Sequence, residues 1–302
     1  NSYVYEAGGR RTRLSDLIAG MHDLAGLERI KFVTNYPKDM TDDLLDAVRE
    51  LPKVVKYLHV PVQSGCDEVL KRMKRNYTAG YYMDMLARCR ERVPGVSVSS
   101  DFIVGFCGET EESFQKSMEL VRAAKFKNSF IFKYSERGGT KAAERYPDDV
   151  PEDVKKRRNN DLLAVQNENS RLDHRAQVGT VVEVLVEGPS RREQSQQASG
   201  GRKPPEGGAN HLLQLTGRSM ADHIVVFDGP PRLIGATVRV AVTDASPFTL
   251  YGDVEQASGG RQPPEAYDVR EASAARAKGS GSLGGLTPPA RPRPRTFPLP
   301  LV

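Results

Sequence analysis

Short β-rich runs alternate with amphipathic helical stretches from residue 28 to residue 135, and this rhythm constrains the fold more than any other feature of the chain. The β-rich runs cover residues 29–34, 57–61, 96–104 and 128–134. Helical spacing of apolar residues predicts helices that open at Thr41, pass through Val69 and Met73, open again at Thr78, and run from Thr110 to Ala124. Strands separated by helices pair in parallel, so we expect an α/β fold.

One earlier unit of the same kind precedes these repeats. Residues 14–24 have the pattern of a helix, and its strand would end near Tyr3. We therefore expect residues 1–150 to be the carboxyl-terminal part of an open (β/α) barrel. The chain begins with Asn1 rather than Met and shows no signal sequence, so we expect a piece of a longer protein.

The periodicity changes beyond residue 179, where five short runs alternate apolar and polar residues. They cover residues 180–187, 211–215, 223–227, 237–242 and 249–254. Several short, closely spaced strands predict a small OB-like β-barrel within residues 175–255. A polar helical stretch at residues 151–174 is expected to connect the two domains.

Two nearly identical Gly- and Pro-rich segments, residues 197–206 and 256–265, interrupt and follow this second domain. A repeat of this composition cannot bury a core, so we expect a low-complexity insert at residues 191–210 and a disordered tail at residues 256–302. The formal net charge of +5 is concentrated there, because residues 256–302 carry seven basic and three acidic side chains. The charge therefore gives no reason to assign nucleic-acid binding to the folded part.

The composition excludes two other classes of protein. No apolar run approaches the roughly 20 residues of a membrane helix, and the three cysteines are too few and too scattered for a secreted disulfide framework. We expect a cytoplasmic protein.

Three strand ends carry groups that could serve chemistry, and ligands of parallel α/β folds bind at the carboxyl ends of strands. Residues 59–65 contribute an imidazole, an amide and a hydroxyl; residues 100–110 contribute two glycines before a helix; residues 134–140 contribute a cation. Each pattern also fits a purely structural role, namely a buried histidine, a tight strand-to-helix turn or an exposed arginine.

Taken together, these segments resemble the radical S-adenosylmethionine (SAM) methylthiotransferase family, and most closely its branch that modifies isopentenyl-adenosine in tRNA. The motifs are Leu-His-Val-Pro-Val-Gln-Ser-Gly at 58–65, Val-Leu-Lys-Arg-Met-Lys-Arg at 69–75, Ser-Asp-Phe-Ile-Val-Gly-Phe at 100–106, and Tyr-Ser at 134–135 with Arg137 and Gly139-Thr140. The resemblance runs from residue 1 to about residue 255, apart from the low-complexity segments. It implies a radical-SAM barrel followed by a TRAM domain, an RNA-binding β-barrel.

The resemblance also implies the reaction and its cofactors. In that family, a cluster held by a Cys-x3-Cys-x2-Cys motif cleaves SAM to a 5′-deoxyadenosyl radical, which abstracts hydrogen from an adenosine beside the anticodon. A second 4Fe-4S cluster supplies the sulfur and another SAM supplies the methyl group. The implied partner is the anticodon stem-loop of tRNA, and we expect a monomer.

The site residues follow from the same resemblance. The side chains and backbone expected around SAM are those of His59, Gln63, Ser64, Ser100, Asp101, Ile103, Gly105, Tyr134 and Arg137. On the β-barrel, the basic groups expected to contact RNA are Arg218, Arg232 and Arg239, beside the aromatic residues Phe227, Phe248 and Tyr251.

The chain departs from the family in its cysteines. Cys66, Cys89 and Cys107 lie too far apart to form the cluster motif, and Cys107 replaces a proline that is usual in the family's Gly-Phe-Pro-Gly-Glu run. We identify no catalytic residue and no metal ligand in this chain, and we expect it to be inactive alone.

Four alternatives stay open at this point. Within the family, the substrate could be threonylcarbamoyl-adenosine of tRNA or an aspartate of a ribosomal protein. Outside it, the chain could be a non-catalytic RNA-binding remnant or an unrelated barrel enzyme that binds a phosphate.

Overall fold

The computed structural model describes residues 3–33, 35–198 and 212–255 of the chain. Residues 1–255 form one compact unit. Most of the expected insert and the whole expected tail lie outside the described residues.

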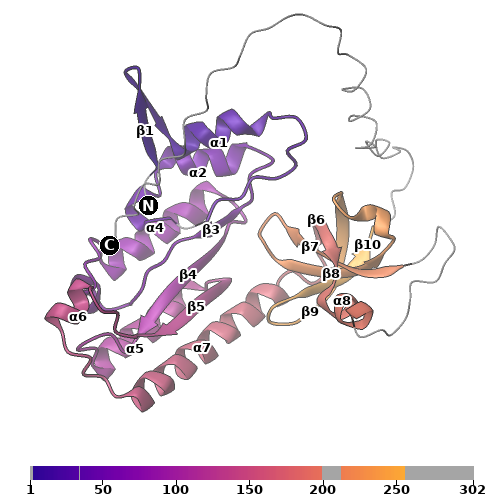
Figure 1. Ribbon diagram of the computed structural model, residues 1–302. Helices are drawn as coiled ribbons and strands as arrows, with labels where there is room; N and C mark the ends of the chain where they lie inside the picture. The colour runs from indigo at the N-terminus through magenta and orange to yellow at the C-terminus, as the bar shows by residue number, and fades with distance from the viewer. Residues whose placement is uncertain (1–2, 34, 199–211, 256–302) are drawn as a thin grey trace, which may run out of the picture. The chain divides into compact units, whose positions relative to one another are not determined.

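Three parallel strands form the sheet of the α/β part (Figure 1). They are β3 (Tyr57–His59), β4 (Ser97–Val104) and β5 (Asn128–Lys133), with β4 in the middle. The register pairs His59 with Ser99 and Asp101 with Phe130. This sheet confirms the expected parallel α/β arrangement.

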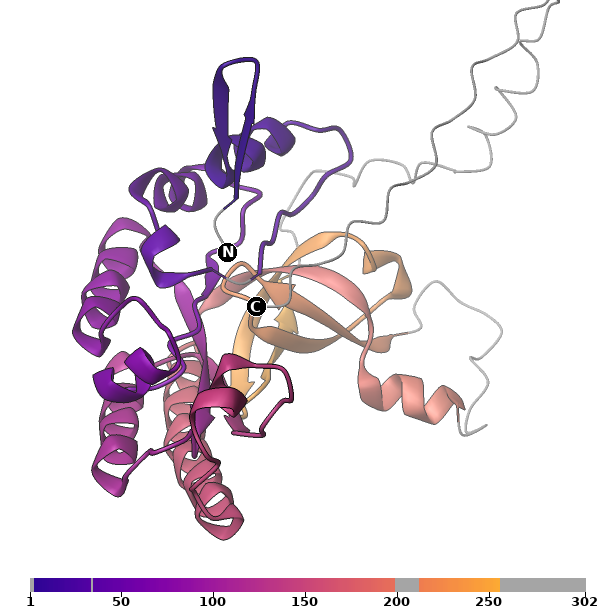
Figure 2. The ribbon, with the colours of Figure 1, turned by 60° about the vertical axis from the view of Figure 1, so that its left-hand side comes forward.

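Helices cover one side of the sheet (Figure 2). They are α2 (Asp42–Glu50), α3 (Asp67–Arg72), α4 (Ala79–Arg92) and α5 (Glu111–Ala124). The hydroxyls of Thr78 and Thr110 accept hydrogen bonds from the first turns of α4 and α5, as helix caps do. Between the helices and the sheet lies the main apolar core, which includes Tyr82, Phe102, Phe114 and Phe126.

The beginning of the chain differs from the sequence prediction. Residues 29–33 form no strand, because only Ile30 makes a bridge, to Val54, while Arg29 and Lys31 direct their side chains to the β-barrel. An antiparallel hairpin of β1 (Val4–Ala7) and β2 (Arg10–Arg13) was not predicted. The helix α1 (Leu14–His22) follows as expected, and the 3-10 turn η1 (Pro37–Asp39) precedes α2.

The expected connector is a 24-residue helix, α7 (Glu152–Arg175), preceded by the short α6 (Lys141–Arg145). It also packs on the α/β part, because its Leu162 is fully buried in the main core. The Gln166 and Asn159 amides donate to the carbonyls of Phe126 and Ile131. The helix is therefore part of the sheet's cover as well as a link.

The second domain is a closed five-stranded β-barrel, as the period-two pattern predicted. Its strands are β6 (Val181–Pro189), β7 (Leu213–Ser219), β8 (Ile224–Gly229), β9 (Thr237–Ala245) and β10 (Leu250–Val254). The strand β10 closes the barrel by pairing in parallel with β8 and antiparallel with β9. The helix α8 (Arg191–Ala198) occupies the start of the expected insert, and η2 (Pro231–Leu233) follows β8. No helix in the described residues is long and apolar enough to cross a membrane.

A buried carboxylate joins the β-barrel to the sheet. Asp222 lies in the turn between β7 and β8, is only 6% exposed, and pairs with Lys31 at 2.6 Å and Arg218 at 3.1 Å. Lys127, at the start of β5, donates to the Asp222 backbone carbonyl. Lys31 and Lys127 both lie over the Tyr57 ring, which adds cation–π contacts.

Because Lys127 is buried in this junction, we expect the free energy of unfolding to increase with pH. Burial lowers the pKa of Lys127 from 10.5 to about 8, although Asp222 opposes the shift. Between these two values the unfolded chain binds a proton that the folded chain has lost, so the free energy of unfolding rises with pH.

We expect the Lys127 contribution to rise by about 3 kcal/mol between pH 8 and pH 10.5. Urea unfolding of wild type and Lys127→Met at several pH values measures it, and the variant should lack this rise. The exposed Lys71→Met is the control and should keep it. If the free energy of unfolding changed with pH in the same way in wild type and in Lys127→Met, the lowered pKa would not belong to Lys127.

Candidate active site

The side of the sheet that the helices leave uncovered carries the residues of greatest interest. Because side chains alternate along a strand, His59 of β3, Asp101 and Ile103 of β4, and Phe130 and Phe132 of β5 share this side. We call these five residues the open face. Phe130 and Phe132 are 51% and 53% exposed, and Asp101 and Ile103 are partly exposed.

A chain of hydrogen bonds fixes the polar part of the open face. The Tyr57 hydroxyl lies 2.6 Å from the Ser99 hydroxyl, which lies 2.7 Å from His59 Nδ1. His59 Nε2 lies 3.3 Å from an Asp101 carboxylate oxygen, and the ring packs edge-on against Phe130. The imidazole is thus held in one orientation with its carboxylate partner at the more exposed end.

The strand-end turn after β3 is built from backbone contacts. Gln63 has a positive φ of 75°. Its backbone N–H donates to the Asp101 backbone carbonyl, and its backbone carbonyl accepts from the Ile103 N–H. Ser64 is buried, and its hydroxyl lies 3.4 Å from that of Ser117 on α5. The Gln63 and Ser64 side chains are both nearly inaccessible, at 8% and 1%.

Gly65 explains why this turn packs so closely on α5. A Cβ atom at Gly65 would lie 2.4 Å from the backbone carbonyl oxygen of Lys116. That backbone cannot move without displacing α5, so only glycine fits. The Gly65 amide donates to the Ser117 hydroxyl at 2.9 Å.

The strand end after β4 is organised by a buried ion pair. Gly105 has a φ of +70°, and its amide donates to Glu109 at 2.6 Å. Glu109 pairs at 3.0 Å with Arg158 of α7, and both side chains are at most 5% exposed. Burial raises the pKa of Glu109, while Gly105 and Arg158 favour its charged form. The Gly105 amide is therefore already occupied by the protein itself.

Tyr134 and Arg137 follow β5. The Tyr134 ring packs edge-on against Phe106, and its hydroxyl has no hydrogen-bond partner among the described residues. Burial, with Cys107 nearby, raises the pKa of Tyr134 to about 12. The Arg137 side chain is exposed, and its backbone carbonyl accepts from Thr140.

The structure does not bring all the predicted residues together. Ser100 points to the helix-covered side, where its hydroxyl contacts Val60 and Tyr82 and is fully buried. Its side chain therefore cannot reach a ligand on the open face. Sequence reasoning missed Phe130 and Phe132, although their alternation with Ile131 in a strand was a usable signal.

The three arginines expected to contact RNA have different environments. Arg218 is committed to Asp222 and Glu187, and Arg239 pairs with Glu255 at 2.8 Å. Arg232 is exposed in η2 and makes no ion pair with another described residue. The aromatic side chains also differ, because Phe227 is buried in the barrel core whereas Phe248 is 60% and Tyr251 39% exposed.

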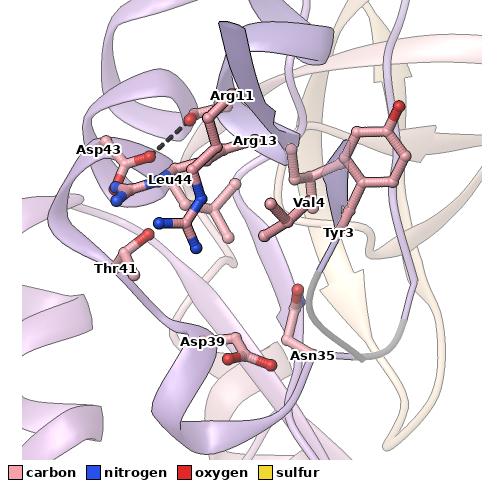
Figure 3. A pocket seen from close by; sticks show the side chains of 11 residues that line it. Tyr3, Val4, Arg11, Arg13, Asn35, Asp39, Thr41, Asp43 and Leu44 are labelled. Atoms are coloured by element: carbon pink, nitrogen blue, oxygen red, sulfur yellow. Dashed lines mark hydrogen bonds and ion pairs between the residues drawn. The ribbon is translucent and has the colours of Figure 1, made fainter. Parts of the chain in front are cut away.

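A cavity of about 200 Å³, lined by both apolar and charged side chains, lies between the β1–β2 hairpin and the start of α2. Figure 3 shows Arg11 and Arg13 on one side of it and Asn35 and Asp39 on the other. The backbone N–H of Asn35 donates to the His59 backbone carbonyl at 2.9 Å, which places the cavity near the end of β3. Arg13 is paired with Asp43, so the cavity carries mixed charge rather than an excess of either sign.

The cysteines do not gather into a cluster site. Cys66, Cys89 and Cys107 are buried and free. Cys66 and Cys107 belong to one small apolar cluster and Cys89 to the main core, and no candidate metal group among the described residues includes a cysteine. Among the described residues, one group of three could approach a metal ion: Asp173, His174 and His223. His223 Nε2 lies 2.7 Å from an Asp173 carboxylate oxygen, and His174 Nδ1 lies 2.8 Å from the Ser170 carbonyl oxygen. His174 Nε2 is buried and has no hydrogen-bond partner among the described residues.

Comparison with protein families supports the domain order that the sequence predicts. Residues 4–121 match the model described as the radical SAM superfamily. This part of the chain is similar to radical SAM proteins. Residues 208–254 match the TRAM domain, which covers most of the β-barrel. The order expected from the sequence, a radical SAM barrel followed by a TRAM domain, is confirmed.

Two similar proteins share one name, tRNA-2-methylthio-N(6)-dimethylallyladenosine synthase. The protein from Rhodopirellula baltica is 52% identical over 255 residues, which are 84% of this chain and 51% of that protein. The one from Bordetella pertussis is 44% identical over 238 residues, or 79% and 49%. The chain thus spans about half the length of the curated relatives it matches. These relatives confirm the expected resemblance to the methylthiotransferase family.

A solved radical SAM enzyme, coproporphyrinogen III oxidase (HemN) from Escherichia coli, also matches. It is 23% identical, with a TM-score of 0.36 over 43% of this chain and 29% of that one. At that score the overlap does not define the fold.

The buried Glu109–Arg158 ion pair can be tested for its contribution to the stability of the turn after β4. Arg158→Met leaves the Glu109 carboxylate buried without its cation, so we expect the free energy of unfolding to fall by about 3–5 kcal/mol. Urea denaturation measures the change.

The neighbouring Arg157→Met is the matched control, because Arg157 makes only exposed pairs with Glu111 and Asp161. It should cost much less, and Glu109→Gln combined with Arg158→Met should recover part of the loss. Equal losses for Arg157→Met and Arg158→Met would show that the buried pair does not hold this strand end.

Proposed function

We propose that this chain is the part of a tRNA methylthiotransferase that presents dimethylallyl-adenosine beside the anticodon to a SAM-derived radical. The observation that carries the proposal is the order of the domains: a radical SAM sheet with an open polar and aromatic face, followed by a TRAM barrel, in a chain whose relatives share that enzyme name. The threonylcarbamoyl-adenosine and ribosomal-protein alternatives have no comparable support.

The residues on the open face fit SAM. The Asp101 carboxylate offers an anion for the polar end of the molecule, and His59, whose ring nitrogens are paired with Ser99 and Asp101, orients that carboxylate. Ile103 and the backbone near Gln63 and Gly105 are proposed to line the adenine, and Tyr134 and Arg137 the mouth. The side chain of Ser100 is not part of this pocket. Bound SAM would supply the radical, whereas these residues would bind and orient it.

The iron–sulfur clusters have no fitting ligands among the described residues. The superfamily implies such clusters, but Cys66, Cys89 and Cys107 lack the spacing of the cluster motif, and no candidate metal group in the described part of the chain contains a cysteine. We therefore assign this chain the binding of SAM and RNA, and no step of cluster chemistry.

The proposed macromolecular partner is the anticodon stem-loop of tRNA, bound in the cytoplasm by a monomer. Single-stranded RNA is recognised by cations that contact phosphates and by exposed aromatic rings that stack on bases. On the TRAM barrel these would be Arg232 with Phe248 and Tyr251, all exposed. Arg218 is bound in the Asp222 junction, so we propose that it positions the barrel rather than contacting phosphate.

RNA binding by the whole chain tests the proposal. We expect an anticodon stem-loop to bind with an affinity that falls as salt rises, and Arg232→Ala to weaken it and to reduce the salt slope by roughly 0.7. Fluorescence anisotropy at several salt concentrations measures both.

Arg122→Ala is the matched control, since it removes an equally exposed arginine from α5 and should leave the slope unchanged. An absence of salt-dependent binding by the wild-type chain would refute the tRNA part of the proposal.

A further inference from the structure

Two phenylalanine side chains stand uncovered on a surface that parallel sheets normally bury. All-parallel sheets are usually covered on both faces, yet Phe130 and Phe132 are each more than half exposed. Both come from β5 and, two residues apart, point to the same side. The intervening Ile131 packs against the main core. The strand therefore contacts the helices through Ile131 and does not need Phe130 or Phe132 for that contact.

The neighbours of these rings place them inside the candidate active site. The register sets Asp101 opposite Phe130 and Ile103 opposite Phe132 on β4, and the His59 ring lies 6.0 Å from that of Phe130. The aromatic strip of Phe130 and Phe132 is therefore adjacent to the carboxylate already proposed to hold SAM and to the imidazole that orients it. A ligand that lies on the strip lies beside the reacting cofactor.

The strip also has a definite chemical preference. It offers apolar area bordered by one carboxylate, Asp101. The cations Lys31 and Lys127 lie over the Tyr57 ring, at the other end of the sheet. A branched alkenyl group gains by leaving water for such a surface. A threonylcarbamoyl group carries its own carboxylate, which Asp101 would repel and the rings could not solvate.

We propose that Phe130 and Phe132 recognise the dimethylallyl group of the substrate adenosine, and so select the alkenyl-modified base over the unmodified and the threonylcarbamoyl-modified ones. This inference rests on the proposed function, which supplies the RNA substrate. It adds the part of the molecule that distinguishes one modified adenosine from another.

The test measures the affinity of the 302-residue chain for three anticodon stem-loops that differ at one adenosine. These carry unmodified, N6-dimethylallyl and threonylcarbamoyl adenosine. For wild type we expect a roughly tenfold preference for the dimethylallyl RNA over the unmodified one, the range that a small apolar group gives in an apolar site. The threonylcarbamoyl RNA should bind no better than the unmodified one.

Variants locate the preference. Phe130→Ala with Phe132→Ala should abolish it while leaving the affinity for unmodified RNA within about twofold, because that affinity comes mainly from phosphate contacts. Phe130→Leu with Phe132→Leu keeps apolar area and should retain most of the preference. Tyr81→Ala is the control: it removes a ring that is 39% exposed on α4, on the helix-covered side.

The outcomes separate this inference from the proposed function. Absent binding of all three RNAs would refute the proposed function itself. Equal binding of all three by wild type, or a preference that survives the double alanine variant, would overturn the inference and leave the proposed function standing. A loss of preference in Tyr81→Ala equal to that in the phenylalanine variant would also overturn it.

Discussion

The buried carboxylate of Asp222 joins the β-barrel to the sheet. The proposed function, in which the barrel binds RNA and the sheet binds SAM, depends on this contact. Asp222 sits in a β-barrel turn and pairs with Lys31 and Arg218, while Lys127 donates to its backbone carbonyl. A buried acid is tolerated only when such partners compensate its charge. The same partners bind the barrel to the amino-terminal side of the sheet, where the backbone amide of Lys56 also donates to the Met220 carbonyl. In the proposed function, this arrangement would let the barrel hold RNA while the carboxyl ends of the strands remain free to bind SAM.

A second buried ion pair, between Glu109 and Arg158, fixes the structure at the carboxyl ends of the strands. Glu109 accepts from the Gly105 amide and pairs with Arg158, so the turn after β4 is tied to α7. The same helix continues to His174 and Asp173, which contact the junction with the barrel. One helix, α7, thus contacts both the strand-end turn and the β-barrel. Its packing positions the open face relative to the barrel.

The sequence was sufficient for the order of the elements, because hydrophobic periodicity and helix caps are local signals. Thr78 and Thr110 marked helix starts, and the period-two runs marked all five barrel strands. Residues 29–34 were mistaken for a strand because composition alone cannot show that Arg29 and Lys31 turn to the barrel. The hairpin at the beginning of the chain gave no clear alternating pattern.

The candidate site was predicted less completely, since motif resemblance names positions but not the side to which they point. Ser100 and Asp101 are adjacent in one motif, yet only Asp101 faces the open side. The alternation of Val98, Phe102 and Val104 with Ser99, Asp101 and Ile103 contained that information. The role of Arg218 could not be predicted from the sequence. Arg218 and Lys31 both pair with Asp222, and Lys31 lies 191 positions before Asp222 in the chain.

The central claim is that this chain belongs to an enzyme that adds a methylthio group to dimethylallyl-adenosine in tRNA. The most direct measurement is mass spectrometry of tRNA nucleosides from a strain in which the coding sequence has been deleted. The account predicts that 2-methylthio-N6-dimethylallyladenosine disappears and that N6-dimethylallyladenosine accumulates in its place. Unchanged amounts of the methylthio nucleoside, or a loss confined to threonylcarbamoyl-derived nucleosides, would contradict it.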